Sequence, residues 1–263
     1  MIFETHAHYD DKAFEEERDT LLMEINKSGV ERVINVAANL EGCRDSLELS
    51  HKYDFVYCSI GVHPSDTAGL KPEDLVWMEQ ICRREHIKSG GKVVAVGEIG
   101  LDYYWKEPDE QVQKEWFALQ LEMASRVKLP VIIHSREAAK DTLDMMQSLH
   151  AEQIGGIVHC YSYSVEMARE YLNMGFYFGI GGVVTFQNAK KLLEVVAYLP
   201  LDRIVLETDS PYLAPVPNRG KRNSSLNLPY VVSKIAQIKG VSEEEVMKET
   251  TRNAYRVYGL ERK

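Results

Sequence analysis

Two histidines lie two residues apart near the start of the chain, in the stretch ETHAHYD of residues 4–10. On a β-strand, residues i and i+2 project to the same face, so His6 and His8 would point together. Two imidazoles on one face can bind a metal ion. The pair alone is weak evidence, because two histidines at this spacing often occur by chance. Its meaning depends on the side chains that the fold brings to it.

Further metal-binding residue types recur at the ends of short apolar runs. His63, His134 and His159 lie at or just past such ends, and so do the carboxylates Glu98 and Asp209. Each of them has an ordinary explanation when taken alone, as a hydrogen-bonded core histidine, a helix cap or the start of a turn. The remaining histidines fall in expected helices or at helix ends, where a solvated surface role is expected: His51, His86 and His150.

These apolar runs alternate with longer amphipathic stretches. They are β-branched without clean alternation, which is typical of parallel strands covered on both faces. The expected strands are 2–5, 32–38, 55–61, 92–98, 130–134, 156–160, 176–182 and 203–208. The expected helices between them are 13–28, 41–51, 72–88, 109–128, 137–149, 165–174 and 187–198.

Several helix ends carry signals of their own. The first helix stops at Gly29, and Ser164 is a candidate N-cap for the helix 165–174. Two more helices follow the last strand. Pro229 lies near the start of one, and Ser242 with Glu245 forms a capping box for the other.

Strands and helices alternating in this number indicate an α/β fold, the (β/α)₈ TIM barrel. The competing doubly wound sheet carries a Gly-rich phosphate turn after its first strand, and residues 5–8 (THAH) form no such turn. We therefore predict a (β/α)₈ barrel that is a single domain over residues 1–263.

A barrel would bring the scattered residues together, because its active site forms at the C-terminal ends of the strands. Burying so many titratable groups without a metal is costly, so we predict a metal centre. Six protein ligands exceed what one zinc takes, which favours two ions. One ion is assigned to His6, His8, Glu98 and Asp209, and the other to Glu98, His134 and His159, with Glu98 as the bridge.

The ligand chemistry predicts hydrolysis. Mixed nitrogen and oxygen ligands suit Zn²⁺, Mn²⁺ or similar ions, and Mg²⁺ is less at home with imidazole. A metal in such a site lowers the pKa of bound water toward neutrality. Asp209 is the candidate general base, so Glu98 and Asp209 are the predicted catalytic carboxylates.

The substrate side is indicated by basic residues. The loop after the eighth strand carries Arg219, Lys221 and Arg222, and loops at this place in such barrels often bind phosphate. A solvated basic loop explains the charge equally well. Arg136, two residues past His134, would lie at the same mouth and favours an anionic substrate.

An aromatic cluster, Tyr103, Tyr104 and Trp105, follows Glu98. Such rings can stack a nucleobase. Packing that caps the barrel is the competing explanation, which we favour slightly for at least one of the three.

The composition of the chain argues against several classes of protein. There is no run of about 18 apolar residues and no signal peptide, so neither a membrane span nor secretion is expected. Four cysteines without CxxC spacing read as buried or idle thiols, which predicts a cytoplasmic protein. The net charge of −9 does not attract nucleic acid in bulk. No obligate protein partner is evident, and a monomer or weak oligomer is expected.

Motifs along nearly the whole chain resemble those of the TatD family of metal-dependent deoxyribonucleases. They are HAH at 6–8, GVHP at 61–64, GEIGLDYY at 97–104, IIHSR at 132–136, HCYS at 159–162, ETDSPY at 207–212 and RGKRN at 219–223. The resemblance implies an amidohydrolase-like barrel, a site for one or two divalent ions such as magnesium, and hydrolysis of DNA, often exonucleolytic on single strands.

Carried over residue by residue, the family's ligands fall on the six residues assigned above. The resemblance also implies that His63 and Arg136 lie beside the metal site as phosphate contacts. After Asn223 the chain reads SSLNLPY, where the family usually has an acidic residue and a proline. This departure leaves the ligands intact and concerns the substrate-side loop.

The predicted function is therefore a deoxyribonuclease with DNA as substrate. The alternative is a related hydrolase that cleaves an amide, ester or phosphoester of a small molecule, which a deep closed pocket would favour. A phosphoesterase of the polymerase-and-histidinol-phosphatase type also opens with HxH, but it usually needs a late Asp-x-His pair, which this sequence lacks. A barrel that only binds a partner would be expected to have lost a ligand.

Overall fold

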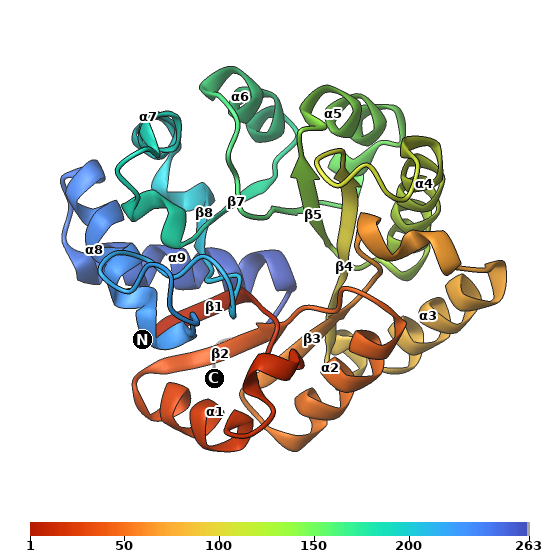
Figure 1. Cartoon of the computed structure of the whole chain (residues 1–263), viewed down its shortest axis with the longest axis horizontal. Coiled ribbons are helices and arrows are strands. Elements are labelled where there is room, and N and C mark those ends of the chain that lie inside the picture. Colours follow the sequence, from red (N-terminus) through yellow and green to blue (C-terminus); the bar gives the residue numbers. More distant parts are fainter. Residues whose placement is uncertain (262–263) are drawn as a thin grey trace.

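A computed structural model describes residues 1–261, and within them eight parallel strands form one sheet that curls into a nearly closed barrel (Figure 1). The strands pair in chain order: β1 (Ile2–Ala7), β2 (Val30–Asn35), β3 (Val56–Ile60), β4 (Val93–Asp102), β5 (Val131–Arg136), β6 (Gly156–Val158), β7 (Tyr177–Ile180) and β8 (Ile204–Leu206). The last strand meets the first, where the Thr5 hydroxyl donates to the Leu206 carbonyl oxygen at 2.9 Å. The predicted (β/α)₈ barrel is confirmed.

Helices surround the strands as an outer layer. They are α1 (Arg18–Lys27), α2 (Leu40–Lys52), α3 (Pro72–Arg84), α4 (Glu110–Val127), α5 (Ala139–Ser148), α6 (Val165–Asn173), α7 (Lys190–Tyr198), α8 (Leu228–Lys239) and α9 (Glu243–Tyr258). Ser164 is the predicted N-cap, since it accepts a hydrogen bond from the Met167 amide, and Ser242 caps α9 by accepting one from the Glu245 amide, which is the serine half of the predicted capping box. No helix in the described part of the chain is long and apolar enough to cross a membrane.

The first helix begins later than predicted. Residues Lys12–Phe14 form a 3-10 turn, η1, and α1 starts only at Arg18. The Asp11 side chain accepts a hydrogen bond from the Ala13 amide, and the Arg18 guanidinium donates to the backbone carbonyls of residues 9–11. These contacts hold the segment in a compact turn that precedes the helix.

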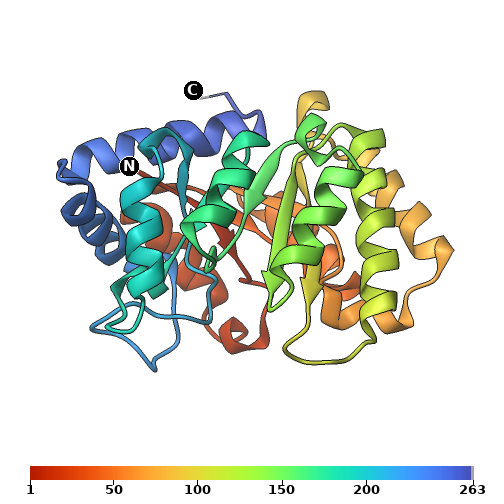
Figure 2. The same cartoon turned by 90° about the horizontal axis from the view of Figure 1, so that it is seen from above.

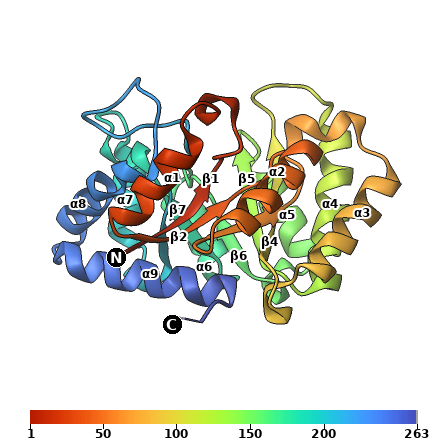
Figure 3. The ribbon, with the colours of Figure 1, turned by 90° about the horizontal axis from the view of Figure 1, so that it is seen from below.

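Helix α9 covers the N-terminal end of the barrel. Phe3 packs edge-on against Tyr255 with ring centroids 5.2 Å apart, and the Tyr258 hydroxyl donates to the Thr5 carbonyl oxygen at 2.9 Å. Figure 3 shows α9 at one end of the barrel and the segments after β1, β4 and β8 at the other. The accessible mouth is therefore at the C-terminal ends of the strands.

Strand β4 continues past Glu98, where the predicted strand ended, to Asp102. Its Gly100 pairs with His134 of β5 and has a φ of +148°, and a Cβ there would lie 1.9 Å from the His134 carbonyl oxygen. Glycine is needed for this close approach of the two backbones. The extension places Asp102 beside the C-terminal end of β5, where it pairs with Arg136.

The four cysteines are free thiols, and Cys43, Cys58 and Cys82 are buried. Burial raises the pKa of each of these three thiols, so they remain protonated at neutral pH. This agrees with the expectation of idle, buried thiols.

Candidate metal centre

The six predicted ligands converge at the mouth of the barrel. They come from five strands or the residues that follow them: His6 and His8 from β1, Glu98 from β4, His134 from β5, His159 after β6 and Asp209 after β8. Their side chains meet because the C-terminal ends of parallel strands share one edge of the sheet.

Glu98 lies at the middle of this cluster, with 3% of its surface exposed. Its Oε2 is 3.4 Å from His6 Nε2 and 3.8 Å from His8 Nε2. Its Oε1 is 2.8 Å from His134 Nδ1 and 3.0 Å from His159 Nε2. The two oxygens thus face two different pairs of imidazoles, which is the arrangement that a bridging carboxylate requires.

Asp209 lies at the solvent side of the cluster. Its Oδ1 is 3.4 Å from His8 Nε2 and 3.8 Å from His6 Nε2. Its side chain is 20% exposed, against 4% for that of Glu98. Asp209 can therefore reach both the cluster and a water that enters from the mouth.

Three of the imidazoles hold their second nitrogen near an oxygen atom. The contacts are His8 Nδ1 to the Val36 carbonyl oxygen at 2.7 Å, His134 Nε2 to Asp102 Oδ2 at 3.0 Å and His159 Nδ1 to Glu207 Oε1 at 3.5 Å. The first two contacts are hydrogen bonds, which fix the tautomer and the ring orientation of metal-binding histidines. The buried His159 Nδ1 lies near Glu207 but has no hydrogen-bond partner among the described residues. The other nitrogen faces Glu98 in His134 and His159, and lies between Asp209 and Glu98 in His8.

Asp102 and Glu207 were missed in the sequence, although both lie in quoted motifs. Asp102 is four residues from Glu98 on β4, so period-2 geometry puts both side chains on one face. Because the predicted strand ended at Glu98, the sequence offered no reason to place Asp102 on the same strand.

Glu207, which follows β8, accepts a hydrogen bond from the Cys160 amide at 2.5 Å. A Cβ on Gly179 would lie 2.0 Å from Glu207 Oε2, so the glycine leaves room for this carboxylate.

The charges in the cluster balance one another. Burial by itself would raise the pKa of Glu98, but the charges of His159 and His6 hold it well below its ordinary value. Burial would likewise lower the pKa of His159, but Glu98 and Glu207 raise it well above its ordinary value. Positive charge on imidazoles thus compensates the buried carboxylate. A divalent cation bound in place of these protons would supply positive charge to the same carboxylate.

His63 is placed beside the cluster. Its Nδ1 accepts a hydrogen bond from the Ser65 amide at 3.2 Å, and its Nε2 lies 4.0 Å from Glu98 Oε1. Burial and the charge of His134 lower the pKa of His63 to about 3. His63 is therefore a neutral imidazole whose Nε2–H is directed into the site.

The donor atoms suit a divalent ion. Nitrogen and carboxylate oxygen atoms lie within 4.8 Å of one another in three groups: His6, His8 and Asp209; His6, Glu98 and His159; and His63, Asp102 and His134. Imidazole together with carboxylate is a ligand set for Zn²⁺, Mn²⁺ and similar ions.

Asp102→Asn should weaken the binding of Mn²⁺ or Zn²⁺ by about 10- to 100-fold, because outer carboxylates orient the ligand histidines and raise their basicity. Isothermal titration of chelator-stripped protein measures this affinity. Asp202→Asn, an exposed aspartate before β8, is the matched control. An affinity unchanged by Asp102→Asn would contradict the role given to this residue.

The predicted basic residues are dispersed. Arg136 ends β5 and pairs in register with Asp102, which places it at the mouth. The Arg219 guanidinium lies 4.3 Å from the Phe186 ring, and Lys221 is exposed. Arg222 instead pairs with Glu17 and donates to the Ala13 carbonyl oxygen. The structure therefore brings Arg136 to the site and turns Arg222 toward the segment before α1.

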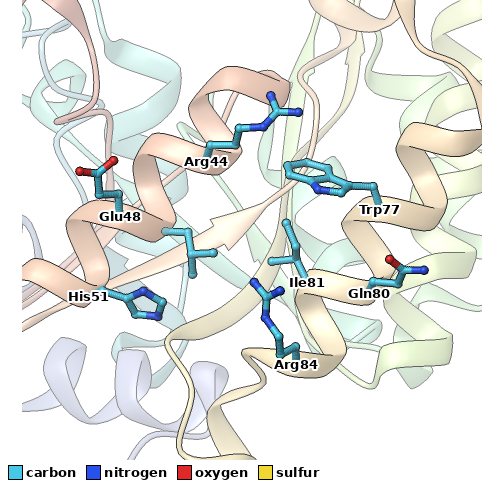
Figure 4. Close-up of a pocket in the computed structure, with 8 residues that line it drawn as sticks. Arg44, Glu48, His51, Trp77, Gln80, Ile81 and Arg84 are labelled. Carbon is cyan, nitrogen blue, oxygen red and sulfur yellow. The ribbon is translucent and has the colours of Figure 1, made fainter.

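A separate hollow of about 500 Å³ lies between α2 and α3 in the helical layer (Figure 4). Leu47 and Ile81 line it together with polar side chains, and the Arg44 guanidinium lies 4.6 Å from the Trp77 ring. None of the predicted site residues lines this hollow. It is distinct from the metal centre.

Comparisons with known proteins show what this chain is similar to. The sequence model of the family described as TatD related DNase matches residues 3–259. Over 260 residues the chain is 41% identical to the uncharacterized metal-dependent hydrolase YabD of Bacillus subtilis, covering 99% of this chain and 100% of that protein. It is 36% identical over 264 residues to the uncharacterized metal-dependent hydrolase YcfH of Escherichia coli K12, covering 99% and 97%.

The fold of this chain is also similar to that of a solved structure. The crystal structure of YJJV, a TatD homolog from Escherichia coli K12, matches with a TM-score of 0.92 at 28% identity, covering 99% of this chain and 98% of that chain. Sequence and fold both match over almost the full length. The chain therefore belongs to the TatD family of metal-dependent hydrolases.

Proposed function

We propose that this chain hydrolyses phosphodiester bonds of DNA, acting on single-stranded ends. In this proposal His6, His8, Glu98 and Asp209 would hold one divalent ion, and Glu98, His134 and His159 would hold a second. The ions would be Mg²⁺, Mn²⁺ or Zn²⁺. A bound ion supplies Lewis acidity and lowers the pKa of water toward neutrality.

The protein's own side chains supply the remaining steps. Asp209, at the solvent side, accepts the proton of the attacking water. The Nε2–H of His63 donates a hydrogen bond to a phosphate oxygen. The Arg136 guanidinium holds a phosphate by two parallel hydrogen bonds. Arg219 and Lys221 attract the backbone farther along the strand, and Arg222 joins them when it leaves Glu17.

The observation that carries the proposal is that the candidate ligands reach solvent at the mouth of the barrel, where the Arg136 guanidinium also lies. The side chains of His8, His134 and Asp209 are 12%, 16% and 20% exposed, so the centre reaches solvent at the mouth. A polymer end can approach such a centre, whereas a small molecule is usually enclosed by its pocket. The description of the matching family as TatD related DNase supports the choice of DNA.

Chelator-stripped protein should be inactive on single-stranded DNA, and Mg²⁺ or Mn²⁺ should restore cleavage. Gel analysis of oligonucleotides labelled at either end measures the rate and shows whether nucleotides are removed from an end. The control panel holds an amide, a carboxylic ester and a phosphomonoester. Cleavage of a panel compound but of no DNA with any divalent ion would refute the DNA substrate and leave the metal centre standing.

A further inference from the structure

Exposed large hydrophobic side chains gather on two loops of the mouth. In residues 1–261 these are Tyr104 and Trp105 after β4, and Tyr212, Leu213 and Val216 after β8. Figures 2 and 3 show both loops projecting from the same end of the barrel. The other exposed large hydrophobics of the described chain lie outside these loops: Met1, Met23, Val76, Tyr198 and Tyr230.

The loop after β4 presents the largest exposed ring. Trp105 is 61% exposed and Tyr104 is 46% exposed, and their rings meet edge-on with centroids 4.9 Å apart. Tyr103 differs, because its hydroxyl donates to Asp141 at 2.8 Å and its ring packs against the core. Packing against the core therefore explains Tyr103. Tyr104 and Trp105 instead contact each other edge-on and keep much of their ring surface exposed.

A cation connects this aromatic pair to the metal centre. The Arg136 guanidinium carbon lies 3.8 Å from the centroid of the Tyr104 ring and 5.9 Å from that of Trp105. Within the described residues the guanidinium forms no ion pair with a carboxylate, so its N–H groups are free for an anion. Arg136 pairs in register with Asp102, whose carboxylate contacts His134 at 3.0 Å.

An indole can stack on a flat aromatic ring, and a guanidinium can bind an anion, so the two together fit a ligand that carries both groups. We propose that Trp105, with Tyr104 and Arg136, forms a subsite for one unpaired nucleotide next to the cleaved bond. The base stacks on Trp105, and the attached phosphate contacts Arg136. Inside a duplex both faces of a base are covered by neighbouring bases, so the subsite takes a base of a single strand that has a face open to the indole. This inference rests on the proposed function and names the side chains that hold one nucleotide of the single strand.

Trp105→Ala should raise the KM for a short single-stranded oligonucleotide by about 5- to 150-fold, the range measured for loss of one base–aromatic stack. The kcat should change much less, because Trp105 touches no metal ligand. Trp105→Phe should restore most of the affinity. Trp77→Ala, which removes an indole from the hollow between α2 and α3, is the matched control and should leave KM unchanged.

An abasic scan identifies the contact itself. Removing the base from one terminal nucleotide should raise the wild-type KM by the same factor, and the Trp105→Ala protein should lose nothing further on that oligonucleotide. Equal KM values for wild type and Trp105→Ala on intact DNA would overturn the subsite while the nuclease proposal stood. A change in oligomeric state on size exclusion with no change in KM would identify the surface as a protein interface and also overturn it.

A binding measurement separates this inference from catalysis. Fluorescence anisotropy of a labelled oligonucleotide, with chelator present, reports affinity without turnover. Weaker binding by Trp105→Ala than by Trp77→Ala supports the subsite even if the wild type cleaves no DNA. Equal binding by the two variants overturns it.

Discussion

Glu98→Gln should lower kcat/KM for metal-dependent hydrolysis of single-stranded DNA by about 10³-fold or more. Both oxygens of Glu98 face imidazoles, at 2.8 Å from His134 and 3.4 Å from His6. Glutamine keeps the shape of the side chain but removes the negative charge and one of the two acceptor oxygens. A bound ion contributes several kcal/mol of transition-state stabilisation, and each 1.36 kcal/mol corresponds to a factor of ten in rate.

Metal content distinguishes this explanation from misfolding. Glu98→Gln should bind less Mn²⁺ or Zn²⁺ per chain, as measured by plasma mass spectrometry after dialysis, while its far-ultraviolet circular dichroism matches the wild type. Glu115→Gln makes the same chemical change at an exposed position of α4 and should keep full activity. A Glu98→Gln protein with wild-type metal content and rate would show that this carboxylate holds no ion.

Asp209→Asn should lower kcat by about 10²- to 10⁴-fold, the range contributed by a positioned general base. Asp209 has a φ of +58°, and asparagine adopts this left-handed conformation as readily as aspartate. The backbone should therefore be undisturbed. The Asp209 amide should keep its 2.9 Å hydrogen bond to the His6 carbonyl oxygen.

The metal dependence of this variant separates its two roles. If Asp209 acted only as a ligand, excess Mn²⁺ would restore the rate. A general base cannot be replaced in this way, so we expect the loss to persist at saturating metal. Asp202→Asn, before β8 and exposed, is the matched control. A wild-type kcat in Asp209→Asn would show that this residue is not the general base. A wild-type kcat in His6→Ala would show that His6 is not a metal ligand.

The order of elements could be predicted from the sequence because it depends on local patterns. Apolar β-branched runs, glycine stops and serine caps act over a few residues, and each of the eight strands overlaps the one expected from these patterns. Parallel strands in a barrel then bring all their C-terminal ends to one mouth. For this reason the convergence of His6, Glu98 and His159 followed from their places at strand ends. Their binding of metal remains a prediction.

The end of β4 could not be predicted in this way. Its last residues are held by β5, with Gly100 opposite His134, and this pairing partner lies more than thirty residues away in the chain. The extension brings Asp102 against His134, a contact that no local pattern encodes. Pairing between distant strands therefore decided which carboxylate supports this histidine.

The ETHAHYD stretch of residues 4–10 likewise has one feature set by local spacing and another set by the fold. Its spacing predicts that the two imidazoles point together, and His6 Nε2 and His8 Nε2 do lie 3.1 Å apart. Their surroundings came from the fold, as did the ion pair between Arg222 and Glu17, two residues from opposite ends of the chain. The sequence by itself determined the barrel and the residues at its mouth, because short-range preferences set both. The tertiary structure decided the partner of each nitrogen, oxygen and guanidinium, because those contacts depend on long-range packing.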